Sequence, residues 1–155
     1  MKNIIFNILL LVSLSSLGQN NSEKSKVLKS EKIKIDSIEI QVSVYENRIE
    51  TESYFEKNKS KLSVIYFKKA EKFNEIVTRE NCPSMPEDFW RSYLFSFENE
   101  KIVNKEEERY YSSGKMHGIA GHIDKEVRES YNKTLNSEFL KKYVVELFEK
   151  IKNYR

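Results

Sequence analysis

Residues 89–123 read FWRSYLFSFENEKIVNKEEERYYSSGKMHGIAGHI, and this stretch decides the fold. Three extended runs are separated by two turns, a charged one at 98–101 and a Gly-containing one at 112–115. The second turn is typical of a β-hairpin connection, because Gly114 can adopt a positive φ at no steric cost. We therefore predict a meander of strands that forms the middle of a twisted antiparallel sheet.

The first of these runs has apolar side chains on both sides of the predicted strand. Successive side chains of a strand point to opposite faces of the sheet. One face would carry Trp90, Ser92 and Leu94, and the other would carry Phe89, Tyr93, Phe95 and Phe97. The pattern predicts either a central strand covered on both faces or a strand whose second face belongs to a binding surface.

The nine residues YYSSGKMHG at 110–118 resemble the aromatic, turn and Gly-Lys hairpin of MORN-type β-hairpin repeats. Those families work by repetition, whereas this segment occurs once, with no second copy at a fixed period. The resemblance supports a hairpin at this position and implies no function.

Upstream of this stretch, alternation of apolar and polar residues predicts further strands. Residues 33–44 alternate with β-branched side chains, and residues 49–55 alternate more weakly and are predicted to form an edge strand. Residues 62–79 fit either one long helix or a hairpin of 62–68 with 73–79. We favour the hairpin, because β-branched and aromatic side chains lose χ1 freedom in helices.

The C-terminal region is predicted to be helical. Asp124 is a suitable N-cap for a first helix, and Asn136 with Ser137 provides a second cap. After this cap the apolar residues follow a helical spacing and form a stripe wide enough to lie across a sheet. They are Leu140, Tyr143, Val144, Leu147, Phe148 and Ile151.

Residues 1–18 have the pattern of a secretory signal peptide, with one lysine, a short apolar core and small residues before a polar segment. Ser16 and Gly18 fit the positions before a cleavage site, so we expect cleavage between Gly18 and Gln19. The apolar run at 4–17 is shorter than the ~20 residues that span a bilayer. We therefore expect a secreted or periplasmic protein with no membrane span after cleavage. It is not expected to be a lipoprotein, because its first twenty residues contain no cysteine.

The remaining chain is predicted to comprise a flexible polar tether at 19–32 and one domain at 33–155. The loop at 80–88 holds both prolines and is too short to divide this domain. Loss of residues 1–18 lowers the formal net charge from +3 to +2, which does not indicate a nucleic-acid-binding protein. Cys82 is the only cysteine, so no internal disulfide forms, and we expect its side chain to be buried.

Motifs for chemistry are scarce. His117 and His122 are five residues apart, so on a regular strand they point to opposite faces and do not bind one metal together. The nearby glycines match neither GxxxxGK[ST] nor GxGxxG, and no GxSxG, HExxH or CxxC motif occurs. The acidic run at 106–108 is typical of a solvated face. We expect no catalytic residue, no metal and no cofactor.

These patterns predict a single-domain α+β protein. Its antiparallel meander would have about six or seven strands, with the C-terminal amphipathic helix packed on the sheet. The leading hypothesis is an exported, non-enzymatic binding protein, of an inhibitor or immunity type or an envelope accessory factor. Its partner would be another envelope or secreted protein, and the sequence sets no oligomeric state.

Tyrosine and tryptophan are favoured in protein interfaces, and this preference selects most of the candidate binding residues. The candidates are Trp90, Tyr93, Phe95, Tyr110, Tyr111, His117 and His122. For each aromatic residue, burial in the core is the competing explanation. The alternative function is a small hydrolase or a ligand-binding cup that uses one of the histidines in a concave sheet.

Overall fold

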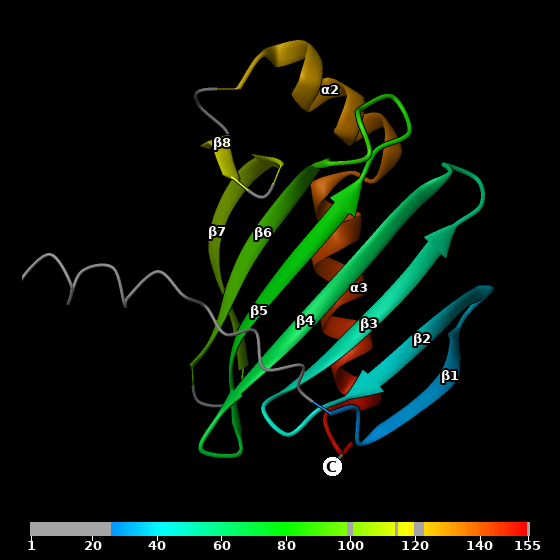
Figure 1. The fold of residues 1–155 in the computed structure, drawn as a ribbon, viewed down its shortest axis with the longest axis vertical. Coiled ribbons are helices and arrows are strands. Elements are labelled where there is room, and N and C mark those ends of the chain that lie inside the picture. The colour runs from blue at the N-terminus through cyan, green and yellow to red at the C-terminus, as the bar shows by residue number, and fades with distance from the viewer. Residues whose placement is uncertain (1–25, 99–100, 114, 120–122, 155) are drawn as a thin grey trace, which may run out of the picture.

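The computed structural model describes residues 26–98, 101–113, 115–119 and 123–154, and it leaves out the side chains of 104–107, 117 and 119. These residues form one antiparallel sheet in which each strand pairs with its neighbours in sequence, and two helices follow (Figure 1). The elements are β1 (Lys29–Ile35), β2 (Ile38–Val44), β3 (Arg48–Phe55), β4 (Ser60–Lys69), β5 (Lys72–Asn81), β6 (Phe89–Glu98), β7 (Lys101–Ser112), β8 (Lys115–Ile119), α2 (Lys125–Thr134) and α3 (Ser137–Ile151). The predicted α+β class and antiparallel meander are confirmed.

The described part of the sheet has eight strands, more than the predicted six or seven. The additional strand arises because 33–44 is not one strand but parts of two, β1 and β2. The apolar spacing changes from two to three between Ile35 and Ile38, and Asp36 turns the chain there with a φ of 52°. β1 also begins at Lys29, so the last four residues of the predicted tether belong to the sheet.

The predicted edge position of 49–55 is wrong, because β3 pairs with both β2 and β4. The weaker alternation arose from Thr51 and Ser53, which are nonetheless buried on the core side. The Thr51 hydroxyl donates to the Val64 carbonyl at 3.2 Å, and the Ser53 Oγ lies 2.6 Å from the Tyr143 Oη. These hydrogen bonds allow polar side chains to occupy an interior strand.

The predicted hairpin is confirmed, since β4 pairs with β5 from Lys61 opposite Asn81 to Lys69 opposite Lys72. A register shift after Phe67 inserts a bulge near its turn. The strand β7 runs from Lys101 to Ser112, so it begins within the predicted charged turn at 98–101 and ends at the Gly-containing turn. The acidic run at 106–108 is therefore part of a strand.

The helix α3 packs across one face of the sheet, which we call the inner face (Figure 1). All six residues of its predicted stripe are buried, as are the strand residues beneath them. Tyr66 on β4 stacks on Phe148 and donates its hydroxyl proton to the Val144 carbonyl at 3.0 Å. No described helix lies on the opposite, outer face of the sheet in Figure 1.

The two predicted helix caps behave differently. The Asn136 side chain accepts a hydrogen bond from the Phe139 N–H at 2.8 Å, whereas the Asp124 side chain makes no capping bond to α2. The predicted positive φ of Gly114 lies outside the described residues, although Ser113 beside it has a φ of 50°. Ser112 and Lys115 pair across this turn, which confirms the hairpin.

We expect Asn136→Ala to lower the free energy of unfolding by about 1 kcal/mol, because an N–H of the first turn of α3 loses its acceptor. Urea unfolding of the variant and the parent protein measures this loss. Asp124→Ala is the matched control and should cost only about 0.3 kcal/mol, since it removes a charge near a helix N-terminus but no capping bond. Equal losses in the two variants would contradict the assignment of Asn136 as the cap.

Candidate functional site

The structure divides the predicted aromatic residues between the two faces of the sheet. Tyr93, Phe95 and Tyr110 are buried on the inner face and belong to the core. Trp90 and Tyr111 are partly buried on the outer face, where they lie directly opposite one another on β6 and β7. Only these last two aromatic residues from the predicted set are therefore available to a partner.

Trp90 and Tyr111 stack on each other at the centre of a row of neighbouring side chains on the outer face. Their ring centroids are 5.6 Å apart and their planes differ by 10°. The Arg79 guanidinium on β5 lies 4.7 Å from the Trp90 ring, and Met116 on β8 is opposite Tyr111 with 58% of its surface exposed. We call Arg79, Trp90, Tyr111 and Met116 the aromatic ladder.

A second row of apolar residues crosses the outer face. Ile65 on β4 is opposite Val77 on β5, and Val77 is opposite Leu94 on β6. Residues that are directly opposite in an antiparallel pair share a face. All three are partly buried. Val77 precedes Arg79 by two residues on β5, so this row lies on the outer face of the sheet together with the aromatic ladder.

The histidine hypothesis is not tested by this structure. His117 lies in β8 at a register shift next to Tyr110 and Tyr111, but its side chain is outside the described part of the chain. His122 lies outside the described residues altogether. Among the residues that are described, no group of three His, Cys, Asp or Glu side chains gathers in a way that could hold a metal.

A buried ion cluster, which sequence reasoning missed, lies on the inner face beneath α2. It consists of Glu80 on β5, Arg91 on β6 and Glu108 on β7, and the side chains of Glu80 and Arg91 are 0% exposed. The Arg91 guanidinium donates twice to the Glu80 Oε2, at 2.7 and 2.9 Å. It also donates to the Asn132 Oδ1 at 2.8 Å and to the Leu135 carbonyl, so it joins the sheet to the end of α2.

Burial and the neighbouring charges act in opposite directions on the pKa values of Glu80 and Arg91. Burial raises the pKa of Glu80 to about 7, against the opposing effect of the Arg91 charge. Burial lowers the pKa of Arg91, but the Glu80 carboxylate together with Tyr93 and Tyr110 outweighs this effect and leaves that pKa above its usual value. Burial and a hydrogen bond to the Glu108 carboxylate raise the pKa of Tyr110. Since Glu80 is fully buried, its carboxylate does not meet solvent, and we assign the cluster a structural role.

Cys82 is buried, as predicted, in a second small core with Tyr110 and Tyr131. Its Sγ lies 3.0 Å from the Ser84 Oγ and 3.2 Å from the Thr134 Oγ1. These contacts tie the loop after β5 to the last turn of α2. A thiol enclosed in this way packs as a small apolar side chain with weak hydrogen bonds.

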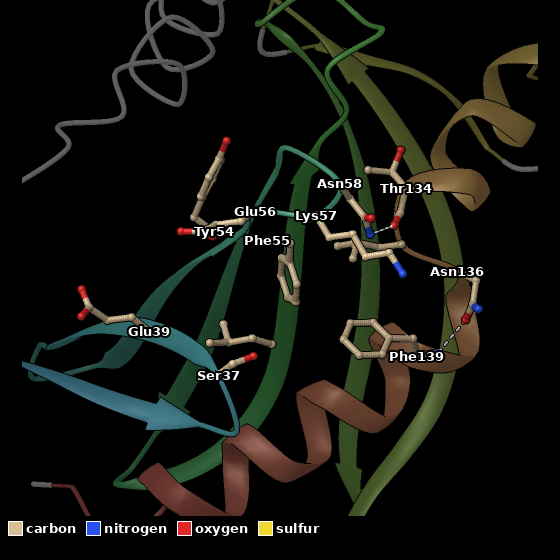
Figure 2. A pocket seen from close by; sticks show the side chains of 12 residues that line it. Ser37, Glu39, Tyr54, Phe55, Glu56, Lys57, Asn58, Thr134, Asn136 and Phe139 are labelled. Atoms are coloured by element: carbon tan, nitrogen blue, oxygen red, sulfur yellow. Dashed lines mark hydrogen bonds between the residues drawn. The ribbon is translucent and has the colours of Figure 1, made fainter.

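An open cavity of about 880 Å³ lies at the end of the sheet near the start of α3 (Figure 2). Three segments line it: the β1–β2 turn, the β3–β4 turn and the connection from α2 into α3. Their lining residues are Ser37, Ile38, Glu39, Tyr54, Phe55, Glu56, Lys57, Asn58, Thr134, Leu135, Asn136 and Phe139. The volume lies in the range of small-molecule sites, roughly 300–1,000 Å³.

No family model, no curated protein and no solved structure matches the chain. Within the described residues, neither α2 nor α3 has the length and apolar character needed to cross a bilayer. The candidate sites are therefore the outer face with its aromatic ladder and the cavity at the start of α3.

Proposed function

We propose that this protein is an exported, non-enzymatic binding protein that captures an envelope or secreted protein on the outer face of its sheet. The observation that carries the proposal is the aromatic ladder on a face that no described helix covers. Core aromatic residues are explained by the packing of α3, but Trp90 and Tyr111 lie on the other side of the sheet. The signal-peptide pattern that the sequence shows at 1–18 is the basis for proposing export.

The ladder resembles an interface hot spot in its chemistry. Tryptophan, tyrosine and arginine are the residues that contribute most to protein interfaces, and they do so when surrounded by apolar contacts. Here the aliphatic row of Ile65, Val77 and Leu94 supplies such contacts on the same face. The competing explanation is that Trp90 and Tyr111 form a stabilising cross-strand pair, worth about 0.2–1 kcal/mol.

The charge of Arg79 indicates the chemistry of the partner. Arg79 is exposed, and no carboxylate among the described residues pairs with it. One face of its guanidinium lies against Trp90, which leaves its N–H groups free to donate to an acidic side chain. The partner is therefore a protein segment that presents apolar side chains together with a carboxylate.

We expect Trp90→Ser and Tyr111→Ser each to lower capture of the partner at least about tenfold, as loss of a hot-spot side chain does. The experiment uses tagged protein beginning at Gln19, with a photo-crosslinking residue in place of Met116, in an extract of the cell envelope. The crosslinked partner is identified and counted by mass spectrometry. The same spectra report whether the natural mature chain begins at Gln19.

Tyr45→Ser is the matched control, because the Arg48 guanidinium lies 4.1 Å from the Tyr45 ring in a similar pair elsewhere on the surface. This variant should capture the partner as well as the parent protein does. Thermal unfolding shows whether each variant remains folded. Capture that is unchanged in both ladder variants, or lost equally in Tyr45→Ser, would overturn the proposal.

A further inference from the structure

The cavity at the start of α3 has an apolar wall formed by two aromatic rings. Phe55 on β3 and Phe139 on α3 meet edge to face, with centroids 5.7 Å apart (Figure 2). Phe139 is 40% exposed although it stacks on the buried Tyr143 at 5.9 Å. Phe139 lies off the buried stripe of α3, so its exposed ring surface faces the cavity instead of the core.

The opposite side of the cavity carries an unpaired cation. Figure 2 shows the Lys57 side chain extending from the β3–β4 turn across the cavity towards the side lined by Thr134 and Asn136. Within the described residues, Lys57 has neither a hydrogen bond nor an ion pair. An ammonium group in this position attracts one anionic group of a ligand.

The acidic residues of the lining do not neutralise Lys57. Glu39 forms an ion pair with Lys32 at 2.6 Å and points away from the cavity in Figure 2. Glu56 lies beside Tyr54 at the rim, on the side away from the Lys57 ammonium. The first turn of α3 borders the cavity, and its N-terminal dipole adds to the attraction for a negative group.

The polar side of the cavity is held in place by side-chain hydrogen bonds. The Asn58 side chain donates to the Thr134 carbonyl, which ties the β3–β4 turn to the end of α2. The Asn136 side chain caps α3 on the same side. Lys57 thus projects from a turn that is anchored to the helices, although its own side chain is exposed.

We propose that this cavity binds a small amphipathic anion, a molecule with an aromatic or acyl body and a single carboxylate. The apolar body packs against the wall that Phe55 and Phe139 form, mainly on the exposed surface of Phe139, and the carboxylate accepts hydrogen bonds from the Lys57 ammonium. The site lies at the β3–β4 turn, whereas the aromatic ladder lies on β5 to β8. The inference is therefore independent of the proposed protein partner and adds a small-molecule site to the chain.

The test uses two fluorescent probes that share an apolar body, pyrenebutyrate and the neutral pyrenebutanol, titrated into the protein beginning at Gln19. We expect saturable binding of pyrenebutyrate that Lys57→Met weakens at least about tenfold, which is the contribution of one charge-assisted hydrogen bond. Lys57→Met should leave the weaker binding of pyrenebutanol unchanged. Phe139→Ala should weaken the binding of both probes, because it removes the apolar wall.

Lys61→Met is the matched control, since Lys61 is a nearby exposed lysine that pairs with Glu52 at 3.1 Å and does not line the cavity. This variant should bind pyrenebutyrate as the parent protein does. The inference is overturned if the parent protein shows no saturable binding of pyrenebutyrate, if acid and alcohol bind equally well, or if Lys61→Met causes the same loss. Partner capture by the Lys57→Met variant separates this site from the outer face, because it should be unchanged.

Discussion

Replacing Arg91 by methionine is expected to lower the free energy of unfolding by about 3–5 kcal/mol at pH 8, the usual cost of removing one partner from a buried ion pair. The methionine fills much of the arginine volume but donates no hydrogen bond. The Glu80 Oε2 then loses both of its donors, and the Asn132 Oδ1 and the Leu135 carbonyl lose one each. Urea unfolding followed by circular dichroism measures the loss.

A double variant keeps this prediction testable if the single variant does not fold. Glu80→Leu combined with Arg91→Met removes both charges, and replacement of a whole buried pair by apolar residues is often neutral or stabilising. We therefore expect the double variant to recover most of the lost stability. A loss below about 1 kcal/mol in Arg91→Met, similar to that expected for the surface residue in Arg79→Met, would show that the buried pair is not important for stability.

The buried pair shows where the sequence was informative and where it was not. Arg91 lies two residues from both Phe89 and Tyr93, and Glu80 lies four residues after Ile76. Residues at these even spacings share a face, so both charges lie on the apolar face of their strands. This local signal was present in the sequence, but the predictions made no use of it. Their partners in the chain, however, lie 41 and 44 residues after Arg91, and no local pattern predicts those contacts.

The most predictable element was α3, because its packing depends on a periodicity contained within one segment. The stripe from Leu140 to Ile151 faces the sheet as predicted, and the β4–β5 hairpin forms for the same local reason. The position of β3 inside the sheet was not predictable in this way, since Ser53 is satisfied by Tyr143, 90 residues later. Contacts between distant segments decide such cases.

The candidate sites were also predictable only where they depend on a pattern within one segment. Alternation along 89–97 correctly separated Trp90 from Tyr93 and Phe95, but only the packing of α3 on one face decides which side is the core. The cavity is formed by three segments far apart in the sequence, so it has no sequence motif. One signal was present nonetheless, because Phe139 is a large apolar residue outside the stripe of its own helix.

The second large effect expected is a pH dependence of stability that originates from Glu80. The pKa of Glu80 is about 7 in the folded protein and near the usual glutamate value of 4.5 in the unfolded chain. Because the folded state holds this proton more tightly, folding is favoured below pH 4.5 and loses that advantage as the pH rises towards 7. Between pH 5 and pH 8 the loss amounts to about 2–3 kcal/mol.

Glu80→Gln isolates this contribution, because glutamine keeps an oxygen acceptor for Arg91 and does not titrate. We expect the parent protein to lose about 2–3 kcal/mol relative to Glu80→Gln when urea unfolding is compared at pH 5 and pH 8. The comparison cancels the contributions of all other titratable groups, because both proteins contain them. Arg91, Glu108 and Tyr131 also act on Glu80, and all three remain in the variant.

The same substitution at an exposed carboxylate, Glu39→Gln, is the control. A hydrogen bond from Lys32 lowers the pKa of Glu39 below the usual glutamate value of 4.5. Its contribution to stability is therefore complete above pH 4.5 and is lost only as the pH falls through the folded pKa, so it does not change between pH 5 and pH 8. Equal pH dependence in the parent protein and in Glu80→Gln would mean that Glu80 is ionised throughout this range and that Arg91, not burial, determines its charge.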